Sequence, residues 1–570
     1  MNTSRCSCLI RVFIAAVAIA LLLSSGNPTC AQNPALVIGS SNTVTADAPV
    51  PRPHESPCVV PLFSGFQFVD FNIQSFQFTP PANCPGPWEK IVFTADFNVT
   101  AGRQFDRTAT VDLVYVNIYF GTTPEPRHNL SPSWHVERDE TDYAALFSSG
   151  QTGHVILGNV VNSTYTGVIS GSAQLEFYQA QGSAGSSPVG SPPDAVLPLT
   201  QANGSGGINE PAFLFTPSDQ LATVFTLPTN IERAYLDVIS QSQIGDEFWY
   251  SCVPNDVAAE LQSCGNTAFR EVEVTIDGQP AGVAPIYPWI YTGGVDPFLW
   301  EPIPGVQTLN FVPYRVDLTP FAGVLSNDQP HKVALSVYNA DNYFSATATL
   351  LLYLDHGSKA VTGTVTTNTI GASPSPSVKE NLHTDASGNI SGSVTTASIR
   401  KFGVDGFVNT SHGRVDTQVR QTVNFRNLQN FTITATTYVQ DISQNTEVVS
   451  NTIRRQGPGS FAVVETFRYP LTLNISLNFA PDGSFTQQTS ASQGFKYSLV
   501  MPMFASFVDN LVTSADTLDI SSAGTLAGNT GAESSQNYNS FDTRGQAYSC
   551  MLTSQDNVLT SVSRGCPSAE

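Results

Sequence analysis

Residues 102–120 read GRQFDRTATVDLVYVNIYF, a polar segment followed at once by β-branched and aromatic residues. The run at 111–120 is rich in Val, Ile, Tyr and Phe, which predicts a buried strand. Similar short runs at 90–99, 154–161 and 172–178 are separated by Gly, Pro and Ser. Runs spaced in this way favour antiparallel strands over helices, so the sequence predicts an all-β protein.

The composition limits the kind of partner that this chain can bind. Only 12% of its 570 residues are charged, and the net charge is −21, whereas soluble domains average about 25% charged residues. Such a surface repels nucleic acid and anionic membranes, so we expect neither as a partner. The negative charge would fall in an acidic medium, which suits an extracellular protein working at low pH. The alternative is that the acidity only keeps the protein soluble.

The first 31 residues have the features of a secretory signal peptide. Arg5 and Arg11 flank a short polar start, residues 12–23 are apolar, and residues 24–31 are small and polar. The apolar run is too short to span a bilayer as a helix. We expect cleavage near Ala31 and a mature chain that is secreted, or periplasmic in a bacterium, without membrane contact.

The cysteines that follow this segment fall into neighbouring pairs. They are Cys58, Cys84, Cys252, Cys264, Cys550 and Cys566. In an oxidising compartment this predicts three structural disulfides, and pairing between sequence neighbours is the arrangement that we favour among the several possible. A metal site would need His and Cys at closer spacing. We therefore expect no metal and no other cofactor.

The chain divides into segments by composition. A Gly-, Ser- and Pro-rich stretch at 179–210 is typical of a surface loop or linker. After about residue 357, Ser, Thr and Asn dominate, and no Trp follows Trp300. Alternation continues in this last third, so it predicts a further β-domain. Aromatic platforms for sugar rings should then lie in the first two domains.

The best candidates for catalysis are carboxylates at the ends of predicted strands. Asp106 and Arg107 stand immediately before the predicted strand, and Glu125 follows that strand. A carboxylate beside an arginine can stay ionised and act as a base that orients water. The alternative is that Asp106 and Arg107 form a pair that stabilises a turn.

A second acidic segment, residues 246–252, reads DEFWYSC. The carboxyls of Asp246 and Glu247 lie close in sequence to Trp249, as in a sugar-binding cleft. In such a cleft an aromatic face packs against the sugar ring, and a carboxyl accepts hydrogen bonds from the sugar hydroxyls or transfers a proton. The alternative is a core Trp with a surface acid. A pair of carboxylates would also fit glycoside hydrolysis.

Several longer motifs resemble one known family. They are residues 102–107, 123–126, 134–147, 157–167, 246–250 (DEFWY), 297–300 (PFLW), 314–320 (YRVDLTP) and 536–542 (QNYNSFD). Together they are similar to the plant and fungal peptide:N-glycanase A family (peptide-N4-(N-acetyl-beta-glucosaminyl)asparagine amidase A). A weaker similarity reaches bacterial peptide:N-glycanase F, in which a Trp-Asp-Arg precedes a strand as Phe105-Asp106-Arg107 does here.

The resemblance implies two jelly-roll β-sandwich domains side by side with a carboxy-terminal β-rich domain added. The expected boundaries are an extended lead-in at 32–60, a first jelly roll at 61–205, a second at 206–356 and the carboxy-terminal domain at 357–570. The activity implied is that of a secreted amidase. It would hydrolyse the bond between asparagine and the proximal N-acetylglucosamine of N-glycosylated peptides or denatured glycoproteins, and leave aspartate.

The resemblance also implies roles for individual residues. Asp106 matches the primary catalytic aspartate of the bacterial relative, and Glu247 is the best match for the acid of its second domain. Substrate contacts are expected from these side chains: Arg107, Glu125, Trp134, Asn159, Asp246, Trp249 and Trp300. Asn159 stands where the bacterial enzyme has a glutamate, and Glu301 stands where the plant-type pattern usually has arginine.

Two other functions remain open from the sequence. One is a glycan-binding β-protein that keeps the aromatic surface without the chemistry. The other is a glycoside hydrolase that uses Asp106 and Glu247 as its carboxylate pair.

Overall fold

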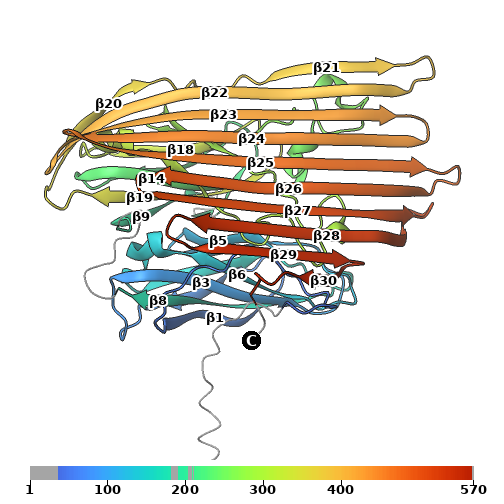
Figure 1. Cartoon of the computed structure of the whole chain (residues 1–570), viewed down its shortest axis with the longest axis horizontal. Coiled ribbons are helices and arrows are strands. Elements are labelled where there is room, and N and C mark those ends of the chain that lie inside the picture. Colours follow the sequence, from blue (N-terminus) through green and yellow to red (C-terminus); the bar gives the residue numbers. More distant parts are fainter. Residues whose placement is uncertain (1–35, 181–190, 203–207, 210, 568–570) are drawn as a thin grey trace, which may run out of the picture.

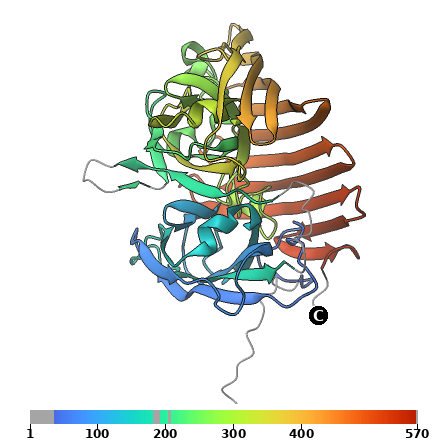
Figure 2. The same cartoon turned by 90° about the vertical axis from the view of Figure 1, so that its left-hand side faces the viewer.

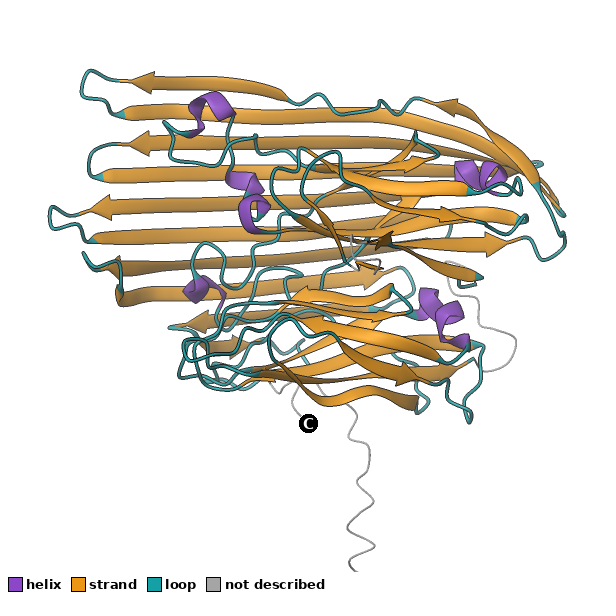
Figure 3. Cartoon of the chain, turned by 180° about the vertical axis from the view of Figure 1, so that it is seen from behind, coloured by secondary structure: helices purple, strands orange, loops and turns teal. Residues whose placement is uncertain are grey.

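The protein is mostly β-structure and consists of several antiparallel sheets, as the sequence predicts (Figures 1 and 3). The structure is a computed structural model that describes residues 36–180, 191–202, 208–209 and 211–567. The expected signal peptide lies outside these residues. In the described parts of the chain, every helix is too short or too polar to cross a membrane. The helices are η1 (Thr141–Ser148), η2 (Ile244–Asp246), η3 (Trp249–Ser251), α2 (Asn255–Ala258), η4 (Pro297–Trp300), η5 (Thr319–Phe321) and α3 (Ala322–Leu325).

The first unit holds two four-stranded sheets, and the chain passes from one to the other after every strand except between β4 and β5, which share a sheet. One sheet has the order β1 (Cys58–Phe68), β8 (Ile169–Gln179), β3 (Trp88–Val99), β6 (Ser133–Asp139). The other has the order β2 (Gln74–Phe78), β7 (Gln151–Leu157), β4 (Thr108–Leu113), β5 (Val116–Thr122). Apolar side chains of both sheets form one core, which includes Phe93, Tyr119 and Phe177.

The second unit repeats this order of strands. One sheet has the order β12 (Ala212–Leu214), β19 (Phe344–Leu354), β14 (Ile231–Ser242), β17 (Tyr314–Asp317). The other has the order β13 (Leu221–Phe225), β18 (His331–Tyr338), β15 (Glu271–Ile276), β16 (Gln279–Pro285). A further strand, β9 (Ala195–Leu199), pairs with β19, and β10 (Gln201–Ala202) pairs with β11 (Ile208–Asn209). Part of the predicted linker is therefore strand, because the apolar side chains of Val196 and Leu199 are buried.

The carboxy-terminal third is one 11-stranded antiparallel sheet. Its strands are β20 (Thr362–Asn368), β21 (Ser377–Thr384), β22 (Ile390–Thr410), β23 (Gly413–Ile433), β24 (Thr437–Gln456), β25 (Gly459–Phe479), β26 (Phe485–Met501), β27 (Phe504–Ile520), β28 (Leu526–Asp542), β29 (Ala547–Gln555) and β30 (Val558–Val562). Figure 2 shows this sheet along one side of the molecule, with the two other units on its inner face. Phe402, Phe425 and Tyr469 of this face share a core with the second unit.

Buried amides of this sheet hold loops of the second unit. Asn427 Nδ2 donates to the carbonyl oxygen of Tyr250 at 2.8 Å, and Gln429 Nε2 donates to that of Cys252 at 2.8 Å. Gln493 Nε2 donates to the carbonyl of Pro288 at 2.7 Å. An amide that leaves water needs a partner inside the protein, and here the loop backbone supplies it. The sheet thus fixes the loops at residues 244–253 and 286–306.

Two of the three predicted disulfides are present, Cys252–Cys264 and Cys550–Cys566. Cys58 and Cys84 are free thiols in the structure, and Cys84 Sγ donates to the carbonyl of Phe177 at 3.6 Å. Burial, followed by the Cys58 thiol, raises the pKa of Cys84 to about 11.

We expect Cys58 and Cys84 to form a third disulfide when the protein is made in an oxidising compartment, because both lie at Phe177: Cys58 is its register partner in the β1–β8 pair, and Cys84 Sγ donates to its carbonyl at 3.6 Å. Mass spectrometry of an unreduced digest should show the peptides of residues 58 and 84 linked. Two alkylatable thiols in the folded, oxidised protein would contradict this pairing.

Candidate functional site

The candidate site lies where the first and second units meet. Asp106 lies in the loop before β4, and Glu125 follows β5. Glu247 lies between η2 and η3 of the second unit. All three side chains are partly exposed. The predicted catalytic pair, Asp106 and Glu247, therefore comes from different units.

Gly293, in a loop of the second unit, joins two of these acids. Its backbone N–H donates to Asp106 Oδ2 at 3.0 Å. A Cβ added to Gly293 would lie 3.1 Å from Asp106 Oδ1 and 2.2 Å from Glu125 Oε2. The two carboxyl oxygens are thus no farther apart than the sum of these distances. A side chain at position 293 would fill the space that they face.

Direct hydrogen bonds fix the two units against each other beside this site. Thr122 N donates to the carbonyl of Thr308 at 2.9 Å, and Thr292 Oγ1 donates to that of Thr123 at 2.8 Å. Gln243 Nε2 donates to Thr108 Oγ1 at 3.0 Å. These bonds occur at the ends of strands, where loops from distant positions meet. The spacing of the acids is therefore set by the packing of both units.

The three acids change each other's protonation. Burial raises the pKa of Asp106, and the Gly293 N–H and Arg107 oppose this rise. Burial and then the charge of Asp106 raise the pKa of Glu125 to about 7. Burial, then the charges of Asp106 and Glu125, raise the pKa of Glu247 to about 7. Mutual repulsion of this kind keeps neighbouring acids from all being ionised together.

Arg107 is held beside the acids by Gln104. Its Nη2 and Nε donate to Gln104 Oε1 at 2.6 and 3.1 Å. The Arg107 guanidinium lies 5.6 Å from the ring centroid of Phe105, which is 5.1 Å from that of Tyr165. Burial lowers the pKa of Arg107, and the charges of Asp106 and Glu125 oppose this.

The tryptophans predicted to bind sugar are buried instead. Trp134 is 2% exposed and stacks on Phe97, with ring centroids 5.5 Å apart. Trp249 is 1% exposed and packs against Phe425 of the large sheet. Trp300 is 2% exposed, and its Nε1 donates to the carbonyl of Gly294 at 2.9 Å. The prediction for these three is corrected: in this structure they are core residues with no face for a ligand, since large aromatic rings stabilise most when buried.

Asn159 is also structural. It is fully buried, and its Nδ2 donates to the backbone carbonyls of Phe68 and Gly167 at 2.9 and 3.3 Å. The side chain ties the loop at 158–167 to the first unit and does not reach the acids as a ligand group.

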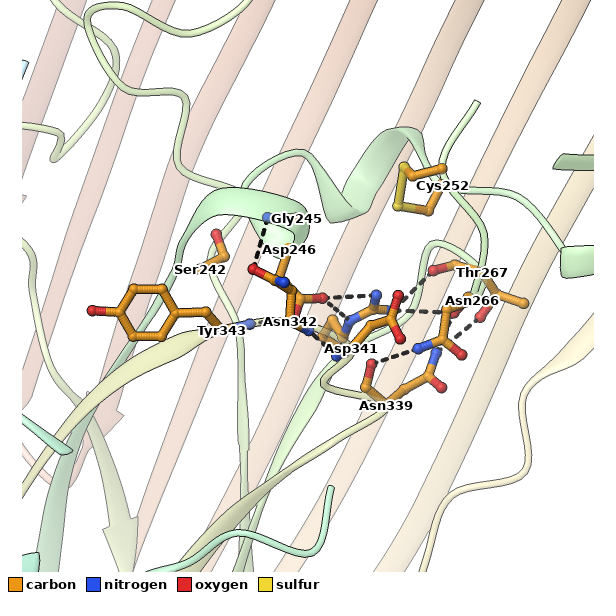
Figure 4. Close-up of polar contacts among 12 residues, drawn as sticks. Ser242, Gly245, Asp246, Cys252, Asn266, Thr267, Asn339, Asp341, Asn342 and Tyr343 are labelled. Atoms are coloured by element: carbon orange, nitrogen blue, oxygen red, sulfur yellow. Dashed lines mark hydrogen bonds and ion pairs between the residues drawn. A yellow bond between two sulfur atoms is a disulfide. The ribbon is translucent and has the colours of Figure 1, made fainter. Parts of the chain in front are cut away.

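Asp246 forms a buried ion pair with Arg270, at 2.9 Å. Figure 4 shows its carboxylate beside Asp341, Asn342 and Tyr343, whose backbone N–H groups all donate to Oδ2. A carboxylate with this many partners has little capacity left for a substrate, and breaking a buried pair is costly. Asp246 is therefore an anchor for the turn that carries Glu247, and not the expected substrate contact.

Glu301 has a partner of its own. Arg127 Nε donates to Glu301 Oε2 at 2.8 Å, and the Arg127 guanidinium lies 5.0 Å from the ring of Phe298. Asn557, in the turn between β29 and β30, hydrogen-bonds Arg127 and the carbonyls of Phe298 and Glu301. The acidic residue at 301 thus joins the first unit, the second unit and the large sheet.

Two residues of the site were missed by sequence reasoning. Gly293 is part of a Gly-Gly pair, whose closeness to two carboxylates only the fold reveals. Gln104 lies inside the motif at 102–107, and its polar side chain is buried under the acid loop. A buried glutamine next to a candidate Asp-Arg pair is a signal that could have been used.

The fold and the site define a mostly-β protein with a cluster of partly buried acids at the junction of two units. A sequence model of the family described as "Peptide N-acetyl-beta-D-glucosaminyl asparaginase amidase A" matches residues 63–370. The chain belongs to this family. The match begins within β1, covers the rest of both units and ends near the start of the large sheet.

One curated relative is the "Peptide-N4-(N-acetyl-beta-glucosaminyl)asparagine amidase A" of Prunus dulcis, which is 32% identical over 364 residues. The alignment covers 61% of this chain and 62% of that protein, so the chain spans less than two thirds of its relative's length. Among solved structures, PNGase F of Flavobacterium meningosepticum aligns with 53% of this chain and 96% of its own, at 14% identity and a TM-score of 0.34. PNGF-II aligns with 53% of this chain and 66% of its own, at 12% identity and a TM-score of 0.36.

Proposed function

We propose that this protein is a secreted amidase that acts on N-glycosylated peptides or denatured glycoproteins. It hydrolyses the amide between asparagine and the proximal N-acetylglucosamine, releases the intact glycan and leaves aspartate. The observation that carries the proposal is the junction of Asp106 and Glu125 with Glu247 of the other unit, in a chain of this family.

The raised pKa values suit the three acids to different catalytic roles. Asp106, with a backbone N–H and Arg107 beside it, is the acid best able to ionise and accept a proton from water. The water oxygen bonds to the amide carbon, and the carbon–nitrogen bond breaks. Glu125 and Glu247 hold protons in mildly acidic solution, so either can protonate the departing nitrogen. The glycosylamine released then loses ammonia in water.

The other two functions have less support. A binding protein without chemistry would rely on exposed aromatic platforms, and the tryptophans expected to supply them are buried. A glycoside hydrolase needs only two carboxylates flanking a sugar bond, whereas this site joins three acids with an arginine.

A defined N-glycopeptide incubated with the protein separates these functions. Release of the whole glycan, with the peptide gaining the mass difference between asparagine and aspartate, supports the amidase. A peptide that keeps one sugar would indicate the glycosidase, and an unchanged glycopeptide would indicate binding alone.

The fold supports two further parts of this proposal. We infer that both units are jelly rolls, because strands β1–β8 and strands β12–β19 are distributed over two sheets in the same order, with β9 added to one sheet of the second unit. We keep the domain boundaries at 61–205, 206–356 and 357–570, with a lead-in at 32–60. Secretion is supported by the two disulfides, which persist in oxidising compartments.

Glu247→Gln is expected to stabilise the protein in mild alkali but not in acid. The folded pKa of Glu247 is about 7, above the value of about 4.3 for an unfolded chain. Protonated Glu247 therefore stabilises the folded state fully below the unfolded pKa, and this stabilisation is lost as the pH rises through the folded pKa and the buried carboxyl becomes charged. Near pH 8 the uncharged glutamine should raise the unfolding free energy by about 1–3 kcal/mol.

Urea unfolding of both proteins at about pH 5 and about pH 8 measures this difference. Glu89→Gln, an exposed acid of the first unit, is the control and should show no such dependence. Equal stability of wild type and Glu247→Gln at both pH values would mean that Glu247 is ordinarily solvated.

A further inference from the structure

A cavity of about 450 Å³ lies far from the acid site. It is formed by the second unit and by the ends of the β22–β23 and β24–β25 hairpins. Thr417 of β23 lines it, whereas Asn427 of the same strand bonds the backbone of Tyr250, close to Glu247. The strand between Thr417 and Asn427 is roughly 30 Å long, so the two sites are separate.

This cavity, which we call the arginine groove, gathers positive charge in an acidic protein. The chain has 25 Lys and Arg residues against 46 Asp and Glu. The groove is lined by four basic side chains: Arg233, Arg454, Arg455 and His412. The acidic side chain in its lining, Glu232, lies 3.7 Å from Arg233 and 3.5 Å from His412. Arg454 is paired with Asp317, which lies outside the lining, whereas Arg455 forms no ion pair among the described residues.

The arginines are held in place while keeping hydrogen-bonding capacity. Arg454 is 19% exposed, donates to the Tyr235 hydroxyl through Nη2 and lies 3.9 Å from Asp317. Its buried Nε has no hydrogen-bond partner among the described residues. A buried donor without an acceptor is costly, so this guanidinium has hydrogen-bonding capacity that the described residues do not use.

The neighbouring arginines are positioned in a similar way. Arg233 lies over the ring of Tyr353 at 3.9 Å, and Arg455 Nη1 donates to Gln418 at 2.7 Å. Fixed guanidinium groups bind planar or tetrahedral oxyanions with little loss of entropy.

Uncharged groups of the groove suit a sugar ring. Phe461 is 39% exposed, and Thr417 and Ser460 also line the cavity. An aromatic face packs against the apolar side of a pyranose, and hydroxyls pair with its hydroxyl groups. We propose that the arginine groove binds an acidic sugar, a pyranose that carries a carboxylate, sulfate or phosphate group, through its arginines and Phe461. This inference does not depend on the amidase activity.

Calorimetric titration of the full chain with glucuronic acid tests the groove, with galactose as the neutral sugar and inorganic sulfate as the bare anion. We expect saturable binding of glucuronic acid and none of galactose. Arg455→Gln should weaken that binding about tenfold, the value of one charged hydrogen bond. Lys496→Gln removes an exposed positive charge paired with Asp509 elsewhere on the sheet and should bind like wild type.

Phe461→Ala separates recognition of the sugar from recognition of its charge. It should weaken glucuronic acid binding and leave sulfate binding unchanged. Equal affinity of wild type and Arg455→Gln would overturn the groove as the binding site. Sulfate binding as tight as that of glucuronic acid, unaffected by Phe461→Ala, would overturn the recognition of a sugar. Melting temperatures of the variants verify that each is folded.

Discussion

Asp106→Asn is expected to lower the rate of glycan release by about a thousandfold or more. Asparagine has nearly the same shape and can still accept the Gly293 N–H, but it cannot take a proton from water. The change also removes a charge that burial disfavours, so the fold should keep its melting temperature or gain slightly. Single-turnover release from a glycopeptide, read by mass spectrometry, gives the rate.

The control for this variant is Asp139→Asn, an exposed acid of β6 that pairs with Lys90. It makes the same chemical change in the same unit, away from the site, and should leave the rate unchanged. Substantial release by Asp106→Asn would remove Asp106 from the catalytic role.

The second large effect is expected for Gly293→Ala. Its new methyl group would lie 2.2 Å from Glu125 Oε2, well inside contact distance, and 3.1 Å from Asp106 Oδ1. Glu125 must turn away, and the methyl occupies the space between the acids where water or the amide would lie. We expect a loss of about a hundredfold or more in the rate, since misplacement by about 1 Å can cost this much.

Gly294→Ala is the matched control, because a Cβ there meets Tyr291 and Ile290 at 3.1–3.3 Å and neither of the acids. It tests whether the loop tolerates alanine. If both variants lost activity equally, the effect would come from the loop backbone and not from crowding of Glu125 and Asp106.

The sequence predicts both the all-β class and Asp106 as a site residue, but the two predictions rest on different features. Alternating apolar runs reveal strands directly. The residue pattern makes Asp106 and Glu247 candidates, but their catalytic roles come from the resemblance, because nothing in residues 102–107 or 246–250 shows that they belong to units that touch. That contact depends on bonds such as Thr122 to Thr308, between residues far apart in the chain.

The tryptophans show where sequence reasoning fails. Trp249 next to Glu247 has the same local pattern whether it faces a sugar or a core. The large sheet decides the outcome, because Phe425 covers Trp249, and Asn427 and Gln429 hold its neighbours. The alternation of the last third predicts strands, but not that their buried amides pair with loops of another unit.

The most direct test of the account is glycopeptide hydrolysis in water labelled with heavy oxygen. Amide hydrolysis by the acids of both units predicts a sugar-free peptide whose new aspartate carries one heavy oxygen from water. A peptide that keeps its proximal sugar, with an unlabelled asparagine, would contradict the account.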